Sequence, residues 1–234
     1  LACGLAFFLE YLDDRFKLPE DVEKHLGLPF LALVPAAGME SAGAWSLSSP
    51  GVPPGVVEAF RALRTNVLFA SAASGVRTVV VTSPGVGEGK TAVAVNLAIA
   101  LAQSGQRVLI IDGDMRRPRV HALLDVPREP GLSHLRVGTA DIADVAHKTS
   151  VPGLFVLPAG RRPPNPAELL GSRRFHDMLR QFDDRHLDWV ILASPPILAV
   201  TDSVVLSHLV SGVLFVVGAD MTRREVARTA LKLL

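Results

Sequence analysis

The stretch from Thr82 to Thr91, T-S-P-G-V-G-E-G-K-T, limits what this chain can fold into more than any other part of it. A β-branched run at 78–81 precedes the stretch, and an alanine-rich run of helix formers at 92–101 follows it. A phosphate-binding loop needs this order of strand, glycine-rich turn and helix, because backbone N–H groups at a helix N-terminus attract phosphate oxygens. The sequence therefore predicts an α/β domain that binds a nucleoside triphosphate.

The residues of this loop have different expected roles. Glycines let backbone N–H groups point inward, Lys90 reaches the β- and γ-phosphates, and the Thr91 hydroxyl ligates Mg²⁺. The first position of the usual G-x-x-x-x-G-K-[ST] pattern is Pro84, so only its second half is met. A glycine-rich turn without a ligand is the alternative, but a lysine directly after glycine at a helix start has no packing role. We expect the nucleotide to contact Gly85, Val86, Gly87, Glu88, Gly89, Lys90 and Thr91.

A pair of acids follows the next predicted strand. The strand predicted at 107–112 ends on Asp112, and Gly113 and Asp114 come directly after it. In a parallel sheet, the carboxyl ends of the strands open onto the crevice where ligands bind. We therefore expect both acids beside the phosphate loop, acting on a metal ion or in catalysis rather than as helix caps.

The rest of the chain predicts the fold class. Apolar runs at 154–157, 189–192 and 212–217 indicate strands, and the stretches at 166–181 and 201–210 indicate helices between them. Strands that alternate with helices predict a three-layer α/β fold with a mostly parallel sheet. The 234 residues suffice for one such domain with a small appendage, and a net charge of +1 gives no reason to expect a nucleic-acid partner.

The beginning of the chain differs from this pattern. Leu1 to Leu9 is apolar but about half as long as a membrane span, so it is either the end of a transmembrane helix or one face of a short helix. Proline at 19 and glycine at 27 bracket a short helix, a strand is predicted at 30–34, and residues 36–54 have the composition of a linker.

Helical periodicity returns over residues 56–70. Its apolar positions predict a buried face, and Glu58, Arg61 and Arg64 are spaced three apart on one polar stripe. A solvated helix face is the simplest interpretation of that stripe.

Several motifs together resemble the bacterial tyrosine kinases of capsular and exopolysaccharide assembly, over nearly the whole chain. They are E-A-F-R-A-L-R-T-N at 58–66, V-L-I-I-D-G-D-M-R-R-P at 108–118, L-P-A-G-R-R-P-P-N-P-A-E-L-L-G-S at 157–172, and S-P-P at 194–196 with V-T-D at 200–202. The resemblance implies a P-loop NTPase fold with deviant Walker motifs. It also implies an ATP-dependent protein-tyrosine autokinase that regulates polysaccharide polymerisation and export.

The resemblance assigns roles to the candidate site residues. Lys90, Asp112 and Asp114 would be catalytic, with Asp112 as the base for the tyrosine hydroxyl. Mg²⁺ would be held by Thr91, Asp112 and Asp114, and the nucleotide would be ATP. Arginines at 116, 117 and 119 would form part of the basic rim of the site, unless they are a solvated charge run.

The resemblance also implies partners, a location and domain boundaries. Glu58, Arg61 and Arg64 would join copies in a homo-oligomer that presents the tyrosine-rich tail of one copy to the next. Residues 1–35 would be the end of a transmembrane helix and the juxtamembrane segment of a membrane-embedded polysaccharide co-polymerase portion. Residues 36–54 would be a linker, and residues 55–234 the kinase domain on the cytoplasmic side of the inner membrane.

Two departures from the family pattern keep other functions open. The Walker B position, which the family fills with aspartate, is Ala193, and the only tyrosine is Tyr11, where a membrane-interface role is the expectation. A catalytically weak nucleotide-binding regulatory module would fit Ala193. A partitioning or positioning ATPase is the third possibility, although Pro84 and Gly85 stand where such enzymes carry an additional lysine.

Overall fold

A twisted sheet forms the centre of the molecule. The computed structural model describes the chain except for residues 1–12, 37–45, 75–76, 136–141 and 182–186. Within the described part, six strands are arranged in the order β3-β4-β2-β5-β1-β6, all parallel except β3, which runs antiparallel to β4. The strands are β1 Thr78–Thr82, β2 Val108–Asp112, β3 His147–Lys148, β4 Leu154–Leu157, β5 Trp189–Ala193 and β6 Gly212–Phe215.

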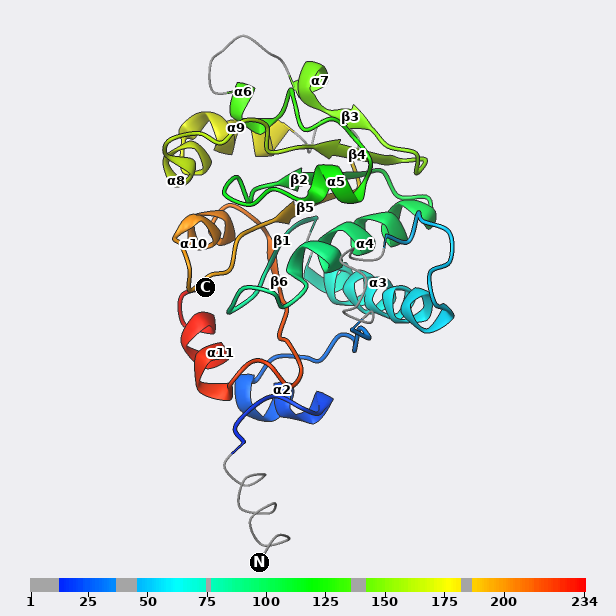
Figure 1. The fold of residues 1–234 in the computed structure, drawn as a ribbon, viewed down its shortest axis with the longest axis vertical. Coiled ribbons are helices and arrows are strands. Elements are labelled where there is room, and N and C mark those ends of the chain that lie inside the picture. Colours follow the sequence, from blue (N-terminus) through cyan, green and yellow to red (C-terminus); the bar gives the residue numbers. More distant parts are fainter. Residues whose placement is uncertain (1–12, 37–45, 75–76, 136–141, 182–186) are drawn as a thin grey trace, which may run out of the picture.

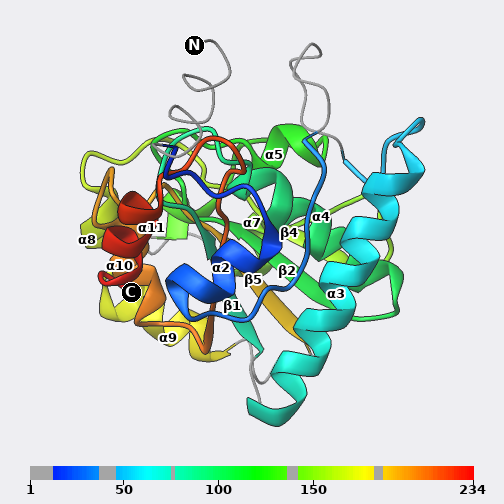
Figure 2. The ribbon, with the colours of Figure 1, turned by 90° about the horizontal axis from the view of Figure 1, so that it is seen from below.

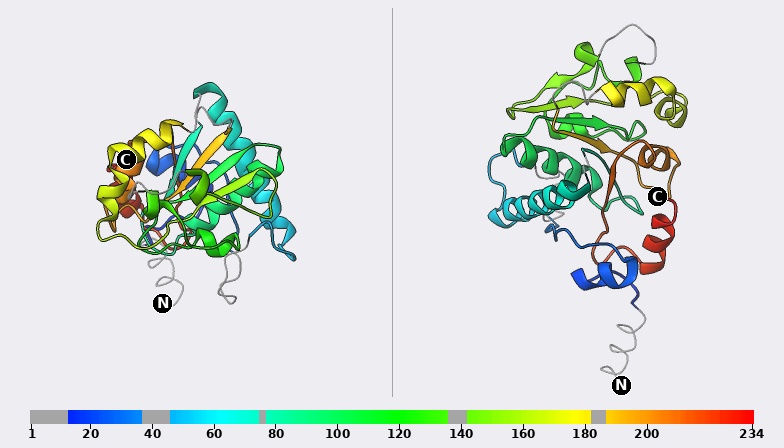
Figure 3. Two further views of the ribbon diagram at one scale, coloured as in Figure 1. Left: turned by 90° about the horizontal axis from the view of Figure 1, so that it is seen from above. Right: turned by 180° about the vertical axis from the view of Figure 1, so that it is seen from behind.

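Helices cover both faces of the sheet, which makes three layers (Figure 1). Helices α3, α4 and α5 pack on one face, while α8, α9 and α10 pack on the other. Helices α2 and α11 lie together beyond the β6 edge (Figure 3). Their bounds are α2 Pro19–Leu26, α3 Pro54–Ser74, α4 Lys90–Gln103, α5 Val120–Leu123, α6 Leu132–Leu135, α7 Ile142–Val145, α8 Pro166–Leu170, α9 Arg173–Gln181, α10 Asp202–Ser207 and α11 Arg224–Leu231.

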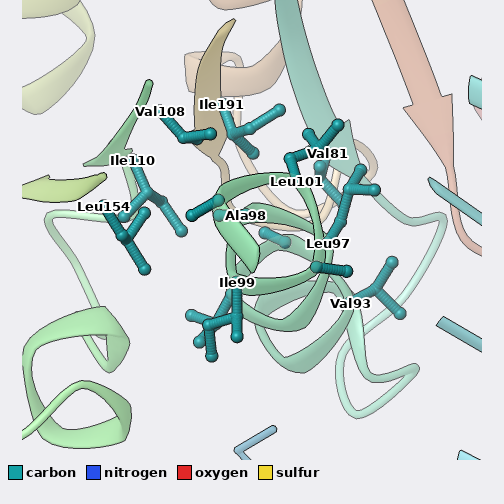
Figure 4. Close-up of a cluster of buried hydrophobic side chains, with 14 of the residues drawn as sticks. Val81, Val93, Leu97, Ala98, Ile99, Leu101, Val108, Ile110, Leu154 and Ile191 are labelled. Carbon is teal, nitrogen blue, oxygen red and sulfur yellow. The ribbon is translucent and has the colours of Figure 1, made fainter. Parts of the chain in front are cut away.

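The core has two halves because side chains alternate along each strand. In β2, Val108 and Ile110 point to the α4 face, while Leu109 and Ile111 point to the opposite face. Helix α4 is buried along most of its length, and its Leu97 and Leu101 pack against the strands (Figure 4). Burial on all sides explains why α4 is alanine-rich and carries no charge after its first residue.

The predicted alternation of strands and helices is confirmed, with one strand wrong and one helix divided. Residues 30–34 form no strand; their chain runs alongside α3, where the Leu31 carbonyl accepts a hydrogen bond from the Asn66 amide (Figure 2). The helix predicted at 166–181 is two helices. Gly171 ends α8, and the Ser172 hydroxyl accepts the N–H of Phe175, which starts α9 in a new direction.

The segment around α2 is fastened to the C-terminal part of the chain. The Phe16 N–H donates to the Thr222 carbonyl, and the Asp21 carboxylate lies 2.9 Å from the Arg224 guanidinium. The predicted apolar stretch Leu1 to Leu9 and the linker residues 37–45 lie outside the described residues. Among the residues that the structure describes, no helix combines the length and the apolar character that crossing a membrane requires.

Candidate functional site

The glycine-rich loop connects β1 to α4 as predicted. Gly87 and Gly89 have φ angles of 88° and 82°, which other residues rarely adopt, and Gly89 is the N-cap of α4. Lys90 is therefore the first residue of the helix, and Thr91 lies half-buried in the first turn. The loop has the backbone form that lets consecutive N–H groups point toward an anion.

Glu88 braces this loop from inside. One of its carboxylate oxygens accepts the N–H of Gly85 at 2.9 Å, and the other accepts the hydroxyl of Thr222. Thr222 is buried on the turn before α11, and its carbonyl accepts the Phe16 N–H. The segment preceding α2 is therefore connected to the phosphate loop through one threonine. No sequence pattern marks Thr222, because it lies 134 residues from Glu88.

Asp112 lies at the end of β2 and is fully buried. One carboxylate oxygen accepts the N–H of Asp114 at 3.2 Å, and the other accepts the N–H groups of Arg119 and Val120, both at 3.1 Å. Burial raises the pKa of Asp112 to about 7, against the opposing effect of these hydrogen bonds. Asp112 therefore fixes the loop after β2 through three backbone hydrogen bonds, and the pKa of its carboxyl lies near neutral pH.

Asp114 lies closest to the phosphate loop. One of its oxygens is 3.7 Å from Nζ of Lys90, and the other accepts the N–H of Arg117 at 3.0 Å. The Lys90 and Asp114 side chains are only 13% and 7% exposed. The structure therefore brings together the lysine and the two acids that the sequence selected from separate segments.

Gly113, between the two acids, is required by close packing. Its N–H donates to the Ala193 carbonyl at 2.8 Å, and a Cβ at this position would lie 2.9 Å from that oxygen. This contact ties the ends of β2 and β5 together beside the phosphate loop.

Arg116 is held by an acid that the sequence analysis gave no role. Asp202 is fully buried at the start of α10 and accepts two hydrogen bonds from the Arg116 guanidinium, at 3.0 and 3.1 Å. This pairing with Asp202 raises the pKa of Arg116 above its usual value. Arg116 is therefore held in place by an ion pair although its side chain is 34% exposed, and its neighbours Arg117 and Arg119 are exposed.

Ala193 occupies the position that the sequence analysis expected. It is the last residue of β5, paired with Asp112 on one side and with Val81 on the other, and it is 1% exposed. The side chains of Asp112 and Ala193 lie on the same face of the sheet, because paired residues of neighbouring parallel strands point in the same direction. A carboxylate at 193 would therefore adjoin that of Asp112.

The polar stripe on α3 is less uniform than the sequence suggested. Glu58 and Arg61 form an exposed ion pair with each other. Arg64 is half-buried and turned toward α4, where its guanidinium donates to the Ala100 carbonyl at 3.3 Å. Its Nε is buried and has no hydrogen-bond partner in the described part of the chain. A solvated face, the simplest interpretation of the stripe, does not hold for Arg64, because α3 packs against α4 there.

The donor set around the phosphate loop suits Mg²⁺. A hydroxyl from Thr91 and carboxylates from Asp112 and Asp114 are hard oxygen ligands. Within the described residues, no three side chains of the His, Cys, Asp and Glu types gather as a metal cage. Magnesium commonly takes one or two carboxylates together with substrate phosphates, so a cage of that kind is not required.

Comparison with known proteins is consistent with this geometry. The AAA domain family matches residues 76–217. The chain is 36% identical to the tyrosine-protein kinase YwqD of Bacillus subtilis, over 74% of this chain and 73% of that protein. It is 32% identical to the tyrosine-protein kinase Ptk of Acinetobacter johnsonii, over 97% of this chain but only 31% of that protein. The solved BceF tyrosine kinase domain is 35% identical, with a TM-score of 0.83 over 94% of this chain and 93% of that one.

Proposed function

Because this chain belongs to the bacterial tyrosine-protein kinase family, we propose that it transfers the γ-phosphoryl group of ATP to protein tyrosines and thereby regulates capsular or exopolysaccharide polymerisation and export. The observation that carries this proposal is the approach of Lys90 to Asp114, 3.7 Å apart, where the phosphate loop meets the end of β2. Phosphoryl transfer depends mainly on positioning and charge neutralisation; Lys90 supplies a positive charge at this place, and Asp114 would hold the metal ion that supplies more.

In the proposed reaction, the tyrosine oxygen forms a bond to the γ-phosphorus while the bond from that phosphorus to the β–γ bridging oxygen breaks, and ADP leaves. Backbone N–H groups of residues 86–91 and the ammonium of Lys90 hold the phosphates and stabilise the developing charge, while the Gly85 N–H is taken by Glu88. Asp112 accepts the proton of the tyrosine hydroxyl. The position of Asp112 at the end of β2, two residues before the acid that faces Lys90, supports this role.

Magnesium would be held by Thr91, Asp112 and Asp114, and it would neutralise charge on the β- and γ-phosphates. The burial of Asp112 beside Asp114 supports this placement. Two neighbouring carboxylates of low exposure need a positive charge to remain ionised together, and Lys90 faces only one of them.

The proposed acceptor is a tyrosine-rich tail presented in trans by another copy of the chain. Copies would associate through Glu58, Arg61 and Arg64 on α3. The exposed Glu58–Arg61 ion pair supports this interface, because its charges are available to a second copy.

We also place the kinase domain on the cytoplasmic side of the inner membrane, next to a membrane-embedded polysaccharide co-polymerase portion. In this scheme residues 1–35 are the end of a transmembrane helix and the juxtamembrane segment, residues 36–54 the linker and residues 55–234 the kinase domain. The docking of the segment before α2 on Thr222 supports a connection between the membrane side and the nucleotide site.

One alternative function has an observation in its favour. Ala193 sits beside Asp112 without offering an acceptor, which fits a catalytically weak nucleotide-binding regulatory module. A partitioning-type ATPase has less support, since Pro84 is buried and the Gly85 N–H is bound by Glu88 where the additional lysine would be needed.

Incubation of the chain with Mg-ATP and a tyrosine-containing peptide, followed by mass spectrometric mapping of phosphotyrosine, tests the proposal. We expect phosphate on peptide tyrosines with the wild-type chain and none with Lys90→Ala. ATP binding without phosphotyrosine would favour the regulatory module, and phosphate release to water alone would favour an ATPase.

A further inference from the structure

Two neighbouring loops at the carboxyl edge of the sheet carry an excess of positive charge. The loop at 113–119 follows β2 and the loop at 158–165 follows β4, and these strands are adjacent in the sheet. Together they contain five arginines and one acid, Asp114. The net charge of the whole chain is only +1, so this edge is a local concentration of positive charge and not a consequence of composition.

Internal ion pairs use some of these arginines and leave others free. Arg116 is bound by Asp202, and Arg161 lies 2.9 Å from the Glu129 carboxylate. Within the part of the chain that the structure describes, Arg117, Arg119 and Arg162 are exposed and have no acidic partner. We call these three residues the arginine rim.

Two of the rim arginines are held beside the proposed catalytic carboxylates by their backbone. The backbone N–H of Arg117 donates to Asp114, and that of Arg119 donates to Asp112. Both arginine Cα atoms are therefore fixed next to the two acids, while their side chains reach solvent. The loop that carries Arg162 is also held in place, because its first residue, Pro158, accepts the N–H of Leu132 at its carbonyl at 2.7 Å.

The strand order separates the loop that carries Arg162 from the phosphate loop. The phosphate loop follows β1, and the sheet continues from β1 through β5 to β2 and then to β4. Strands are spaced about 4.8 Å apart, so the loop after β4 lies roughly 14 Å from the loop after β1. Arg162 is thus displaced from the donor, while Arg117 and Arg119 lie on the loop of the two acids, where an acceptor hydroxyl would lie.

We propose that the arginine rim binds the acceptor segment through carboxylate side chains flanking its tyrosine, so that the preferred substrate is an acidic tyrosine peptide. This inference rests on the proposed kinase function and names its substrate class. A peptide extends about 3.3 Å per residue, so acids two or three positions from a tyrosine at Asp112 come within reach of the loop after β4. Charge complementarity of this kind selects partners and speeds their association.

Peptide binding separates this inference from the kinase activity. The probes are fluorescein-labelled peptides of equal length, with a central tyrosine flanked by Glu, by Gln or by Lys, added to the chain with Mg-ADP. Exposed ion pairs contribute roughly 1.5- to 5-fold each, so the Glu peptide is expected to bind about tenfold more tightly than the Gln peptide. The preference should decrease with added salt, because exposed charges are screened.

Matched variants locate the effect. Arg117→Gln with Arg162→Gln should remove most of the preference for Glu, raise KM for the Glu peptide and leave kcat and ADP affinity nearly unchanged. The control replaces two exposed arginines at the opposite edge of the sheet, Arg77→Gln with Arg107→Gln, which precede β1 and β2. The control variant should keep the wild-type preference.

Three results would overturn the proposal. They are equal binding of the Glu and Gln peptides, an equal loss in the control variant, and a parallel loss of ADP affinity, which would assign the arginines to the nucleotide. Tighter binding of oligo-dT than of the Glu peptide through the same arginines would assign the rim to nucleic acid instead. Absence of phosphotransfer with the binding preference intact would contradict the kinase function alone, whereas phosphotransfer without preference would contradict the rim alone.

Discussion

At the scale of single residues, Lys90 should dominate nucleotide affinity. Lys90 is the first residue of α4, and its ammonium lies 3.7 Å from Asp114, where a bound phosphate would give it a second anionic partner. Hydrogen bonds to charged groups contribute about 1.5–3 kcal/mol, and Lys90→Ala should therefore weaken ADP binding about 10- to 100-fold. Calorimetry with ADP measures this, with Lys148→Ala on β3 as the control. Equal ADP affinity of the wild type and Lys90→Ala would show that the nucleotide does not bind at this loop.

Ala193 is the second test at this scale. An aspartate there would adjoin Asp112, whose pKa is already raised to about 7. Without metal, the new carboxylate should destabilise the fold by roughly 1–3 kcal/mol, because like charges would be buried together. With Mg²⁺ the Ala193→Asp variant should gain single-turnover rate, since outer-shell partners of a metal are typically worth about 10- to 100-fold.

The comparison for this variant is Ala193→Asn, which has similar size but no charge. We expect it to show neither the rate gain nor the Mg²⁺-dependent recovery of stability. ADP affinity measured without metal should be nearly the same for both variants and the wild type. An unchanged Mg²⁺ dependence in Ala193→Asp would contradict the placement of a metal beside this strand end.

At the scale of elements, the docking of α2 on α11 depends on one carboxylate. Asp21 accepts the N–H groups of Lys17 and Leu18, each at 3.1 Å, and pairs with Arg224. These backbone hydrogen bonds, with a smaller contribution from Arg224, lower the pKa of Asp21 below its usual value. Asp21→Asn should reduce the free energy of unfolding at pH 7 by about 1 kcal/mol, as loss of a helix cap does.

The pH dependence of this effect has a definite sign. A carboxylate whose pKa is lowered by folding stabilises the fold fully above its ordinary pKa, and this contribution is lost as the pH falls through the lowered value. The difference between wild type and Asp21→Asn should therefore be constant from pH 6 to 7 and shrink below about pH 4. Urea titrations at several pH values measure it, and Glu20→Gln, an exposed acid in the same turn, should show no such difference.

At the scale of the whole molecule, assembly is expected to depend on α3. Replacement of Glu58, Arg61 and Arg64 by alanine should reduce the oligomer mass in light scattering without unfolding the domain. Isolated exposed ion pairs are worth about 0–1 kcal/mol, so a large loss would mean that these charges are desolvated between copies. The control triple replaces Glu168, Arg173 and Arg174, which changes the charge equally on exposed positions of α8 and α9. Equal oligomer masses for the two triple variants would show that the α3 charges form a solvated face and not an interface between copies.

The fold also indicates which residues of the candidate site could be predicted from the sequence. The phosphate loop, Asp112 and Asp114 were predicted because each lies at the end of a strand with a recognisable apolar pattern. Asp202 could not be assigned in the same way. Its partner Arg116 lies 86 residues away, and no periodicity relates the two positions.

The sequence by itself determined the features that depend on neighbouring residues: the strand, turn and helix around Lys90, the parallel sheet, and the acids that follow β2. The tertiary structure alone decided which distant groups meet. In the folded chain Arg64 is turned toward α4, and residues 30–34 pair with no strand. Thr222 connects Phe16 to Glu88. The physical reason is that periodicity and turn chemistry act over a few residues, whereas these contacts form only after the sheet has fixed where each strand ends.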